Sequence, residues 1–269
     1  MHFKRWVTSL VALPVLGFLI FGGGGPVFAV LIGIVSVIAL REYFRIALTS
    51  GERSGAEALT WPAFIIGPLI IWAAYLKAHG FILGLIGLNL VFCGLVAVLN
   101  FKKNPQIGGL VPKQVLGVVY VPLLLSFLIP VRESDAGTTW IVFLLAVIFA
   151  GDISAFYVGS YGGRHKLAPA VSPGKTIEGA FGGLAGNLIA GAVFKYFFFP
   201  RMSWGAAVCF FLSVGVMGQV GDLFESLLKR AADVKDSGTI LPGHGGLLDR
   251  IDALLFAAPA AYLFKEYIL

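Results

Sequence analysis

The sequence predicts an all-α polytopic membrane protein with about nine transmembrane helices. Three observations support this fold class: the composition, the series of long apolar segments and the placement of the charges. Hydrophobic residues make up 58% of the 269 residues, charged residues only 13%, and the mean hydropathy is +0.90. Soluble domains carry about 25% charged residues, so one water-soluble core cannot take up this much apolar surface. We expect a single membrane domain over residues 1–269.

Apolar segments follow one another along the whole chain. A bilayer core of about 30 Å needs about 20 residues of helix, and glycine, proline and charged residues separate the segments. The first segment also resembles a signal peptide, but the spans that follow it directly favour an uncleaved helix. The sequence GGGGP at 22–26 predicts a tight turn with Pro26 starting the next helix. The predicted spans are 6–21, 26–48, 60–76, 80–99, 110–129, 138–158, 175–197, 203–226 and 248–266.

The basic residues give the expected orientation. With nine spans, five of the 20 lysines and arginines fall on one side of the membrane: Lys77, Arg132, Lys195, Arg201 and Lys265. The richer side is expected to be cytoplasmic, which places the N-terminus inside and the C-terminus outside. The net charge of +6 is therefore a topology signal and does not indicate nucleic-acid binding.

Acidic residues concentrate in the second half of the chain. Because charged groups near hydrocarbon are costly, such a cluster predicts a functional site. We expect residues 1–137 to be a scaffold of five spans and residues 138–269 to form the catalytic part. Eight of the 14 acidic residues lie on the predicted cytoplasmic ends of spans six to nine or in their loops: Asp152, Glu178, Asp222, Glu225, Asp233, Asp236, Asp249 and Asp252.

Two helix ends are expected to bring carboxylates together for a metal ion. Asp249 and Asp252 share a face at the start of the last span. Carboxylates without cysteine ligands suit Mg²⁺, and Asp222 and Asp249 are the preferred ligands. The alternative is that the acids form structural salt bridges, which is the better interpretation for Asp233 and Asp236. The cations named for these bridges are Lys229, Arg230, Lys235 and Arg250. Four residues share one face of the preceding helix, at i, i+3, i+4 and i+7: Asp222, Glu225, Ser226 and Lys229.

Basic residues and glycines beside these acids predict an anionic, polyphosphate partner. Gly243, Gly245 and Gly246 would let backbone N–H groups approach a phosphate, next to the positive end of the last helix. His244 is either a phosphate donor or a plain loop residue. The cations concerned are Lys229, Arg230, Lys235 and Arg250.

Residues 151–179 form the other polar segment. Its GKT triplet does not make a phosphate-binding P-loop, because Pro169 stands where that motif needs glycine. We expect a helix start instead, with Ser172 as its cap and Pro173 in its first turn, so that Lys175 and Glu178 reach the site. The glycines that follow favour close helix packing through overlapping G-x-x-x-G pairs: Gly179, Gly182, Gly183 and Gly186.

The sequence SLLKRAADVKDSGTILPGHGGLLDRID at 226–252, called the signature segment below, resembles the signature of the phosphatidate cytidylyltransferases, or CDP-diacylglycerol synthases. Its fixed points are Ser226, Lys229, Arg230, Lys235, Asp236, Pro242, His244, Gly245, Gly246, Asp249, Arg250 and Asp252. The stretches GDISAFYVG and SPGKTIEG are also similar to polar segments of that family, although Gly174 stands where many members carry a basic residue.

The resemblance implies the reaction of CTP with phosphatidate to give CDP-diacylglycerol and pyrophosphate. It also implies dependence on Mg²⁺ paired with K⁺, Asp222 and Asp249 as metal ligands, and a homodimer. The cations of the signature segment are expected to neutralise phosphates, and Lys166 and Lys175 to meet the lipid headgroup or pyrophosphate. The expected substrate-binding residues are Asp152, Lys166, Ser172, Lys175, Thr176, Glu178, Glu225, Ser226, His244, Gly245, Gly246 and Asp252. Compactness favours a bacterial inner membrane, with the site on its cytoplasmic side.

Other functions compete with this interpretation. A CTP-dependent polyprenol or lipid kinase would share much of the charge pattern, but the full signature segment argues against it. A CDP-alcohol phosphotransferase would show a D-G-x-x-A-R motif that this chain lacks. A cation-coupled transporter would place its acids near the bilayer midplane, often in inverted repeats, whereas here they gather at one face.

Overall fold

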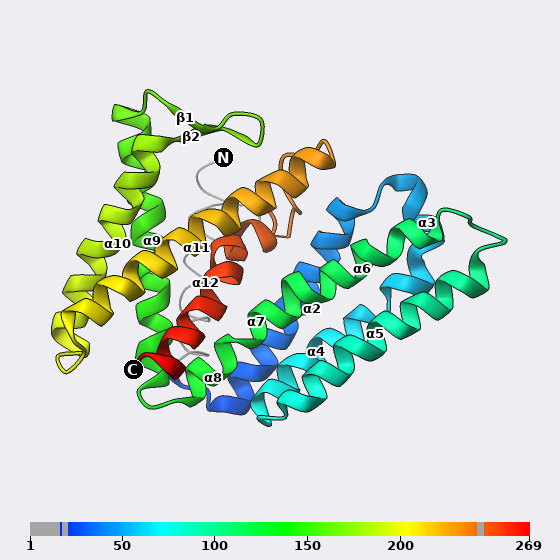
Figure 1. The fold of residues 1–269 in the computed structure, drawn as a ribbon, viewed down its shortest axis with the longest axis horizontal. Coiled ribbons are helices and arrows are strands. Elements are labelled where there is room, and N and C mark those ends of the chain that lie inside the picture. The colour runs from blue at the N-terminus through cyan, green and yellow to red at the C-terminus, as the bar shows by residue number, and fades with distance from the viewer. Residues whose placement is uncertain (1–16, 18–20, 241–244) are drawn as a thin grey trace. The chain divides into compact units, whose positions relative to one another are not determined.

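The computed structural model describes residue 17 and residues 21–240 and 245–269. The predicted first span, apart from residues 17 and 21, therefore lies outside the described residues, as do Pro242, Gly243 and His244. Figure 1 shows a helical chain with one small two-stranded sheet in the described part. The first helices are α2 (Gly25–Ala47), α3 (Ser50–Thr60), α4 (Ala63–Tyr75), α5 (His79–Asn100), η1 (Ile107–Gly109), α6 (Leu110–Val118), η2 (Val119–Leu123), α7 (Leu124–Ser126) and α8 (Leu128–Glu133). The remaining elements are α9 (Gly137–Gly162), β1 (Lys166–Ala168), β2 (Ser172–Thr176), α10 (Ile177–Phe198), α11 (Trp204–Ala231) and α12 (Leu248–Tyr267).

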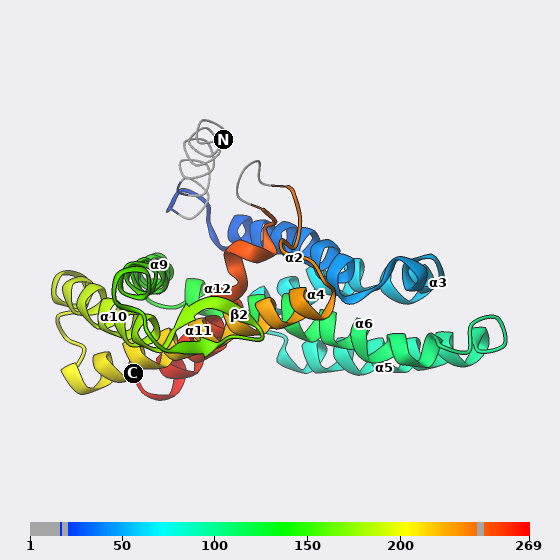
Figure 2. The same cartoon turned by 90° about the horizontal axis from the view of Figure 1, so that it is seen from above.

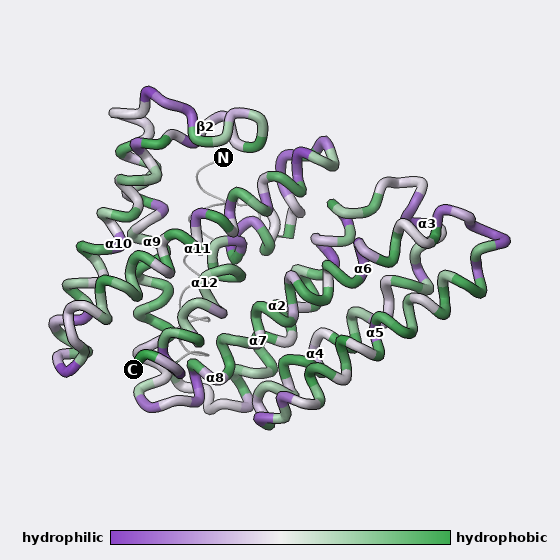
Figure 3. Tube along the Cα trace, viewed as in Figure 1, coloured by the Kyte–Doolittle hydropathy of each residue, from purple (hydrophilic) through white to green (hydrophobic). Residues whose placement is uncertain are grey.

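Seven helical segments within the described residues are long and apolar enough to cross a membrane. Figure 3 shows their hydrophobic runs, with hydrophilic residues gathered mainly at turns and helix ends. They agree with predicted spans two to eight and with a polytopic membrane protein. The predicted ninth span is a helix, α12, but is not among the seven; the count of nine and the orientation stay predictions. The seven are Gly25–Ala47, Gly55–Tyr75, His79–Asn100, Ile107–Glu133, Gly137–Gly162, Ile177–Phe198 and Trp204–Ala231.

The chain forms two compact units, which we call the first and second unit. The first unit comprises residues 1–133 and 231–250, and the second comprises 134–230 and 251–269. The signature segment therefore contributes its loop to the first unit and its flanking helical residues to the second. The prediction of one membrane domain with a catalytic second half stays a prediction.

Local sequence explains two departures from the predicted spans in the first unit. Thr49 and Glu52 form a capping box in which each side chain accepts the other's backbone N–H, and this box starts the unpredicted helix α3. Glu52 also pairs with Lys113 at 2.7 Å, and this hydrogen bond lowers the pKa of Glu52. Pro122 lies in the π-helical turn η2. Because proline has no N–H to donate, the predicted helix 110–129 is interrupted there.

Glycines let α9 and α10 pack closely in the second unit, as their G-x-x-x-G spacing predicts. A Cβ on Gly179 would lie 2.9 Å from the carbonyl oxygen of Ala155, and one on Gly186 would lie 2.9 Å from that of Ala150. Figures 1 and 2 show the two helices side by side. Close backbone contact of this kind is how membrane helices associate without a hydrophobic driving force.

The predicted helix start at Ser172 and Pro173 is wrong. Residues 172–176 form strand β2, which pairs antiparallel with β1. The helix begins at Ile177, and Thr176 is its N-cap, with Oγ1 accepting the N–H of Gly179 at 3.0 Å. Pairing with β1 satisfies backbone groups that a helix would otherwise have satisfied, and this gain is invisible in the local sequence.

Candidate active site

Asp222 lies on α11, and its carboxylate forms an ion pair with a lysine side chain. Lys175 Nζ, carried by strand β2, lies 2.5 Å from Asp222 Oδ2. Ser226, one turn further along α11, donates its hydroxyl to Asp222 Oδ1 at 3.4 Å. The predicted shared face of α11 is therefore confirmed for this pair. The β1–β2 hairpin provides the lysine that the sequence analysis expected from a helix start.

Three carboxylates from three helices act on one another in the second unit. Asp222 repels both Asp152 of α9 and Asp252 of α12, and Asp152 also repels Asp252. Two lysines oppose this repulsion: Lys175 attracts Asp152, and Lys229 attracts Asp252. Such a group of acids suits a hard divalent cation bound to one or two of them, with water and substrate phosphate as further ligands.

Small residues bring α11 and α12 close together at this site. A Cβ on Gly221 would lie only 2.5 Å from the carbonyl oxygen of Asp252, and one on Gly218 would lie 3.6 Å from the Cβ of Ala253. Because Gly221 directly precedes Asp222, the close helix contact and the carboxylate occur at the same level of α11. The sequence GQVGD thus sets both the packing and the position of the acid.

The other charged residues of α11 have structural partners. Glu225 is completely buried and forms an i, i+4 ion pair with Lys229. Arg230 donates from Nε to the carbonyl oxygen of Val171, in the turn between β1 and β2, at 3.2 Å. The salt-bridge alternative is therefore confirmed for Glu225. Asp222 also has an ion-pair partner, although that partner is Lys175, a residue outside the cations the alternative named.

Glu178 and Thr176 organise the start of α10. Glu178 accepts backbone N–H groups from Arg164 at 3.1 Å and from His165 at 3.2 Å, and its carboxylate lies 2.6 Å from His165 Nδ1. These contacts hold the chain that links α9 to β1. Lys166 pairs with Thr176 in the hairpin register, and its side chain is exposed.

Asp249 holds the loop of the signature segment within the first unit. Its Oδ2 accepts the backbone N–H of Gly246 at 2.8 Å and of Ser237 at 3.0 Å, while the Asp249 N–H donates to Ser237 Oγ at 3.3 Å. Gly245 has a φ of +83°, a conformation that favours glycine. The carboxylate therefore fixes the entry of α12 whatever else it binds.

Glu42 is a site residue that the sequence analysis missed. It lies on α2, is only 2% exposed, and accepts the backbone N–H of Leu248 at 2.7 Å and the hydroxyl of Ser237 at 3.2 Å. A Cβ on Gly246 would lie 2.6 Å from Glu42 Oε2, and one on Gly238 would lie 2.1 Å from Oε1. These two glycines are thus required for the buried carboxylate to reach the loop.

Comparison with known proteins identifies the family. A family model described as "Cytidylyltransferase family" matches residues 3–268. This chain belongs to the cytidylyltransferase family. It is 34% identical to "Phosphatidate cytidylyltransferase" of Bacillus subtilis (strain 168), over 96% of each chain. It is also similar to proteins of the same name in two other bacteria. The Helicobacter pylori (strain J99) protein is 30% identical over 98% of this chain and 92% of its own. The Thermotoga maritima (strain MSB8) protein is 37% identical over 65% of this chain and 66% of its own.

The predicted site residues of this cytidylyltransferase family member thus fall into two local groups. Asp152, Lys175, Asp222, Lys229 and Asp252 influence one another in the second unit. Asp249, Gly245 and Gly246 belong to the first unit, together with Lys235 and Arg250, whose side chains are exposed. Within residues 21–240 and 245–269, no three acidic, histidine or cysteine side chains converge as a ready metal cage. The assignment of Asp222 and Asp249 as metal ligands stays a prediction.

Proposed function

We propose that this chain is a phosphatidate cytidylyltransferase, which makes CDP-diacylglycerol for phospholipid synthesis. The observation that carries the proposal is the group of three carboxylates at Asp222, with Lys175 and Lys229 opposing their charge. It occurs in a chain that matches a relative named for this activity over 96% of its length. A polyphosphate substrate with a divalent cation suits such a mixture of acids and lysines.

The reaction needs positioning and charge neutralisation more than it needs a base. The second pKa of a phosphate monoester is about 6, so the attacking oxygen of phosphatidate is already anionic at neutral pH. That oxygen bonds to the α-phosphorus of CTP, the bond from this phosphorus to the bridging β-phosphate oxygen breaks, and pyrophosphate leaves with the electron pair. In-line placement and stabilisation of the developing charge are the protein's contributions.

Mg²⁺ in proteins is usually held by one or two carboxylates together with water and substrate phosphate, and we assign Asp222 and Asp249 as its protein ligands. When bound, Mg²⁺ supplies positive charge to the α-phosphate and to the departing pyrophosphate. Support for a cation at Asp222 comes from the neighbouring charges of Asp152 and Asp252. Lys229, Arg230, Lys235 and Arg250 are assigned to the phosphates of the substrates. The family resemblance further suggests K⁺ beside Mg²⁺, a homodimer, and a site on the cytoplasmic face of a bacterial inner membrane.

The substitution Lys175→Gln separates two roles of the charged residues around Asp222, which are metal binding and phosphate binding. Lys175 Nζ forms an ion pair with Asp222 Oδ2 and so competes with a metal ion for this carboxylate. We therefore expect the variant to bind Mn²⁺ several-fold more tightly than the wild type. We also expect its turnover to be slower, because it lacks a positive charge near the substrate phosphates. Electron paramagnetic resonance of Mn²⁺ and initial rates provide the two readouts. Arg164→Gln, which removes an exposed cation of the same chain segment, serves as the metal-binding control. Unchanged Mn²⁺ affinity in K175Q would exclude this lysine as a competitor of the cation.

The activity itself is tested with purified protein in neutral detergent micelles containing phosphatidate, Mg²⁺ and CTP labelled at either the α- or the γ-phosphate. We expect the α-label to enter the lipid and the γ-label to leave as pyrophosphate. Entry of the γ-label into a lipid would instead identify a kinase. If neither label moves with any lipid, the proposal is refuted, and ion flux into proteoliposomes would test the transporter alternative.

A further inference from the structure

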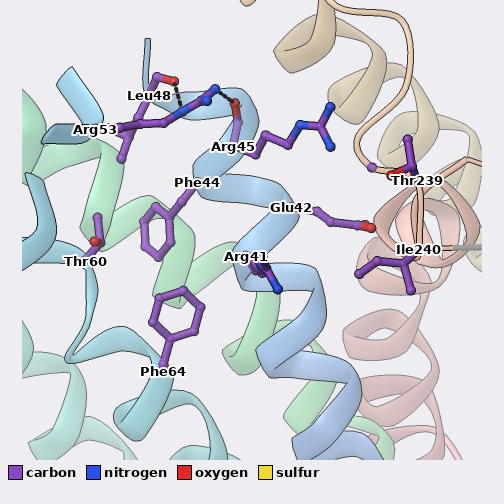
Figure 4. Close-up of a pocket in the computed structure, with 11 residues that line it drawn as sticks. Arg41, Glu42, Phe44, Arg45, Leu48, Arg53, Thr60, Phe64, Thr239 and Ile240 are labelled. Carbon is purple, nitrogen blue, oxygen red and sulfur yellow. Dashed lines mark hydrogen bonds between the residues drawn. The ribbon is translucent and has the colours of Figure 1, made fainter. Parts of the chain in front are cut away.

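A pocket of about 500 Å³ in the first unit is lined by three arginines (Figure 4). Arg41 and Arg45 come from the end of α2, where they are one turn apart, and Arg53 comes from α3. The opposite wall is Gly238–Ile240 of the signature segment. In Figure 4, Arg45 and Glu42 extend from α2 toward Thr239 and Ile240. The pocket is therefore built from residues nearly 200 positions apart in the sequence.

Two of the three guanidinium groups have no partner in the described part of the chain. Arg53 donates from Nε to Leu48 O at 3.1 Å and from Nη2 to Arg45 O at 2.6 Å, which fixes the turn between α2 and α3. Among residues 21–240 and 245–269, the guanidinium groups of Arg41 and Arg45 have neither an ion pair nor a hydrogen bond. The excess of basic residues on the cytoplasmic side of membrane proteins explains arginines at the end of a span. It does not require these arginines to surround a cavity.

The charge of the pocket favours an anion despite one carboxylate in its wall. Of the lining residues, Glu42 alone is acidic, so three arginines and one glutamate leave an excess of two positive charges. Glu42 Oε2 is turned toward Ser237 and Leu248, whose donors it accepts. Arginine is the side chain best suited to bind phosphate, because one guanidinium group can donate hydrogen bonds to two phosphate oxygens at once.

The walls and the position of the pocket match an amphiphile. Phe44 and Phe64, with ring centroids 5.8 Å apart, and Leu48 add apolar surface beside the arginines. The pocket lies where the candidate span Gly25–Ala47 ends and Gly55–Tyr75 begins. Two consecutive spans meet at one membrane face, which is the level at which lipid headgroups lie.

We propose that this pocket binds a phosphate group, and that this group is the headgroup of phosphatidate. The identity of the lipid rests on the proposed function. Lys175 is engaged with Asp222, whereas the guanidinium groups of Arg41 and Arg45 are available to a lipid phosphate in the pocket. Gly238 directly follows Ser237, which is hydrogen-bonded to Asp249, so the pocket adjoins a predicted ligand of the metal ion.

The test compares R41Q/R45Q with the matched control K102Q/K103Q. Lys102 and Lys103 are exposed lysines of the same unit that do not line the pocket, so both variants lose two positive charges. Rates are measured against the mole fraction of phosphatidate in neutral micelles and, separately, against CTP. For R41Q/R45Q we expect the KM for phosphatidate to rise about tenfold or more, as for the loss of charge-assisted hydrogen bonds, with the KM for CTP unchanged. The control should keep both values.

The outcomes separate the two sources of phosphate. A raised KM for CTP alone would assign the pocket to the nucleotide and overturn the lipid assignment, and no change in either KM would overturn the pocket as a substrate site. A second measurement requires no turnover: dioctanoyl phosphatidate should raise the melting temperature of the wild type more than inorganic phosphate does. An equal increase in folded R41Q/R45Q would refute the proposal. Failure of the wild type to make CDP-diacylglycerol would refute the proposed function instead.

Discussion

Asp222→Asn is expected to lower turnover about 10²–10³-fold, the usual loss when one group that organises transition-state charge is removed. The substitution keeps the shape of the side chain and its contact with Ser226, but removes the charge that attracts both Lys175 and the proposed Mg²⁺. The Mg²⁺ concentration for half-maximal rate should rise at the same time. Initial rates over a Mg²⁺ titration measure both effects.

Asp233→Asn is the matched control for this prediction. Asp233 is an exposed aspartate that follows the end of α11, so the variant loses the same charge without touching the carboxylate group at Asp222. We expect its rate and Mg²⁺ dependence to equal those of the wild type. Near-normal turnover of D222N at saturating Mg²⁺ would show that the metal assignment is wrong, while the activity of the protein would remain established by its product.

Sequence reasoning succeeded where the deciding interactions are local. The shared face of Asp222 and Ser226 on α11 follows from helical periodicity. The packing of α9 against α10 follows from glycines at G-x-x-x-G spacing. The helix α3 was missed although its signal was present, because Thr49 and Glu52 have the spacing of a capping box. The signal for α3 is a polar helix start at Thr49 and Glu52, which a pattern of apolar spans does not contain.

Sequence reasoning failed where partners lie far apart along the chain. The hairpin at Ser172–Thr176 depends on its pairing with Lys166–Ala168, whereas the local pattern of Ser172 and Pro173 predicts a helix start. Glu42 meets Ser237 and Leu248, which are 195 and 206 residues away. A carboxylate within a candidate span is by itself a signal of function, and applying that rule to residues 26–48 would have identified Glu42. Only the fold, however, shows that Ser237 and Leu248 are its partners.

Glu42→Ala is expected to destabilise the first unit by about 2–4 kcal/mol, because it leaves the buried N–H of Leu248 without an acceptor and opens a cavity beside the loop. Ser237 loses a hydrogen bond in the same step, and Ser237 holds Asp249. Turnover should therefore fall about 10–100-fold, as when a residue that orients a metal ligand is removed. Unfolding in mixed micelles and Mg²⁺-dependent rates give the two measurements.

Glu42→Gln distinguishes hydrogen bonding from charge. Its amide oxygen can still accept the N–H of Leu248, so stability should stay closer to that of the wild type than in E42A, and the Mg²⁺ dependence should change less. If E42A were as stable as the wild type and bound Mg²⁺ with unchanged affinity, the loop of the signature segment would not depend on α2. A loss of stability in E42A without any change in Mg²⁺ dependence would restrict Glu42 to a structural role. The predicted result, in which both change together, would make the first half of the chain a working part of the site, because a residue of α2 would then position a carboxylate of α12.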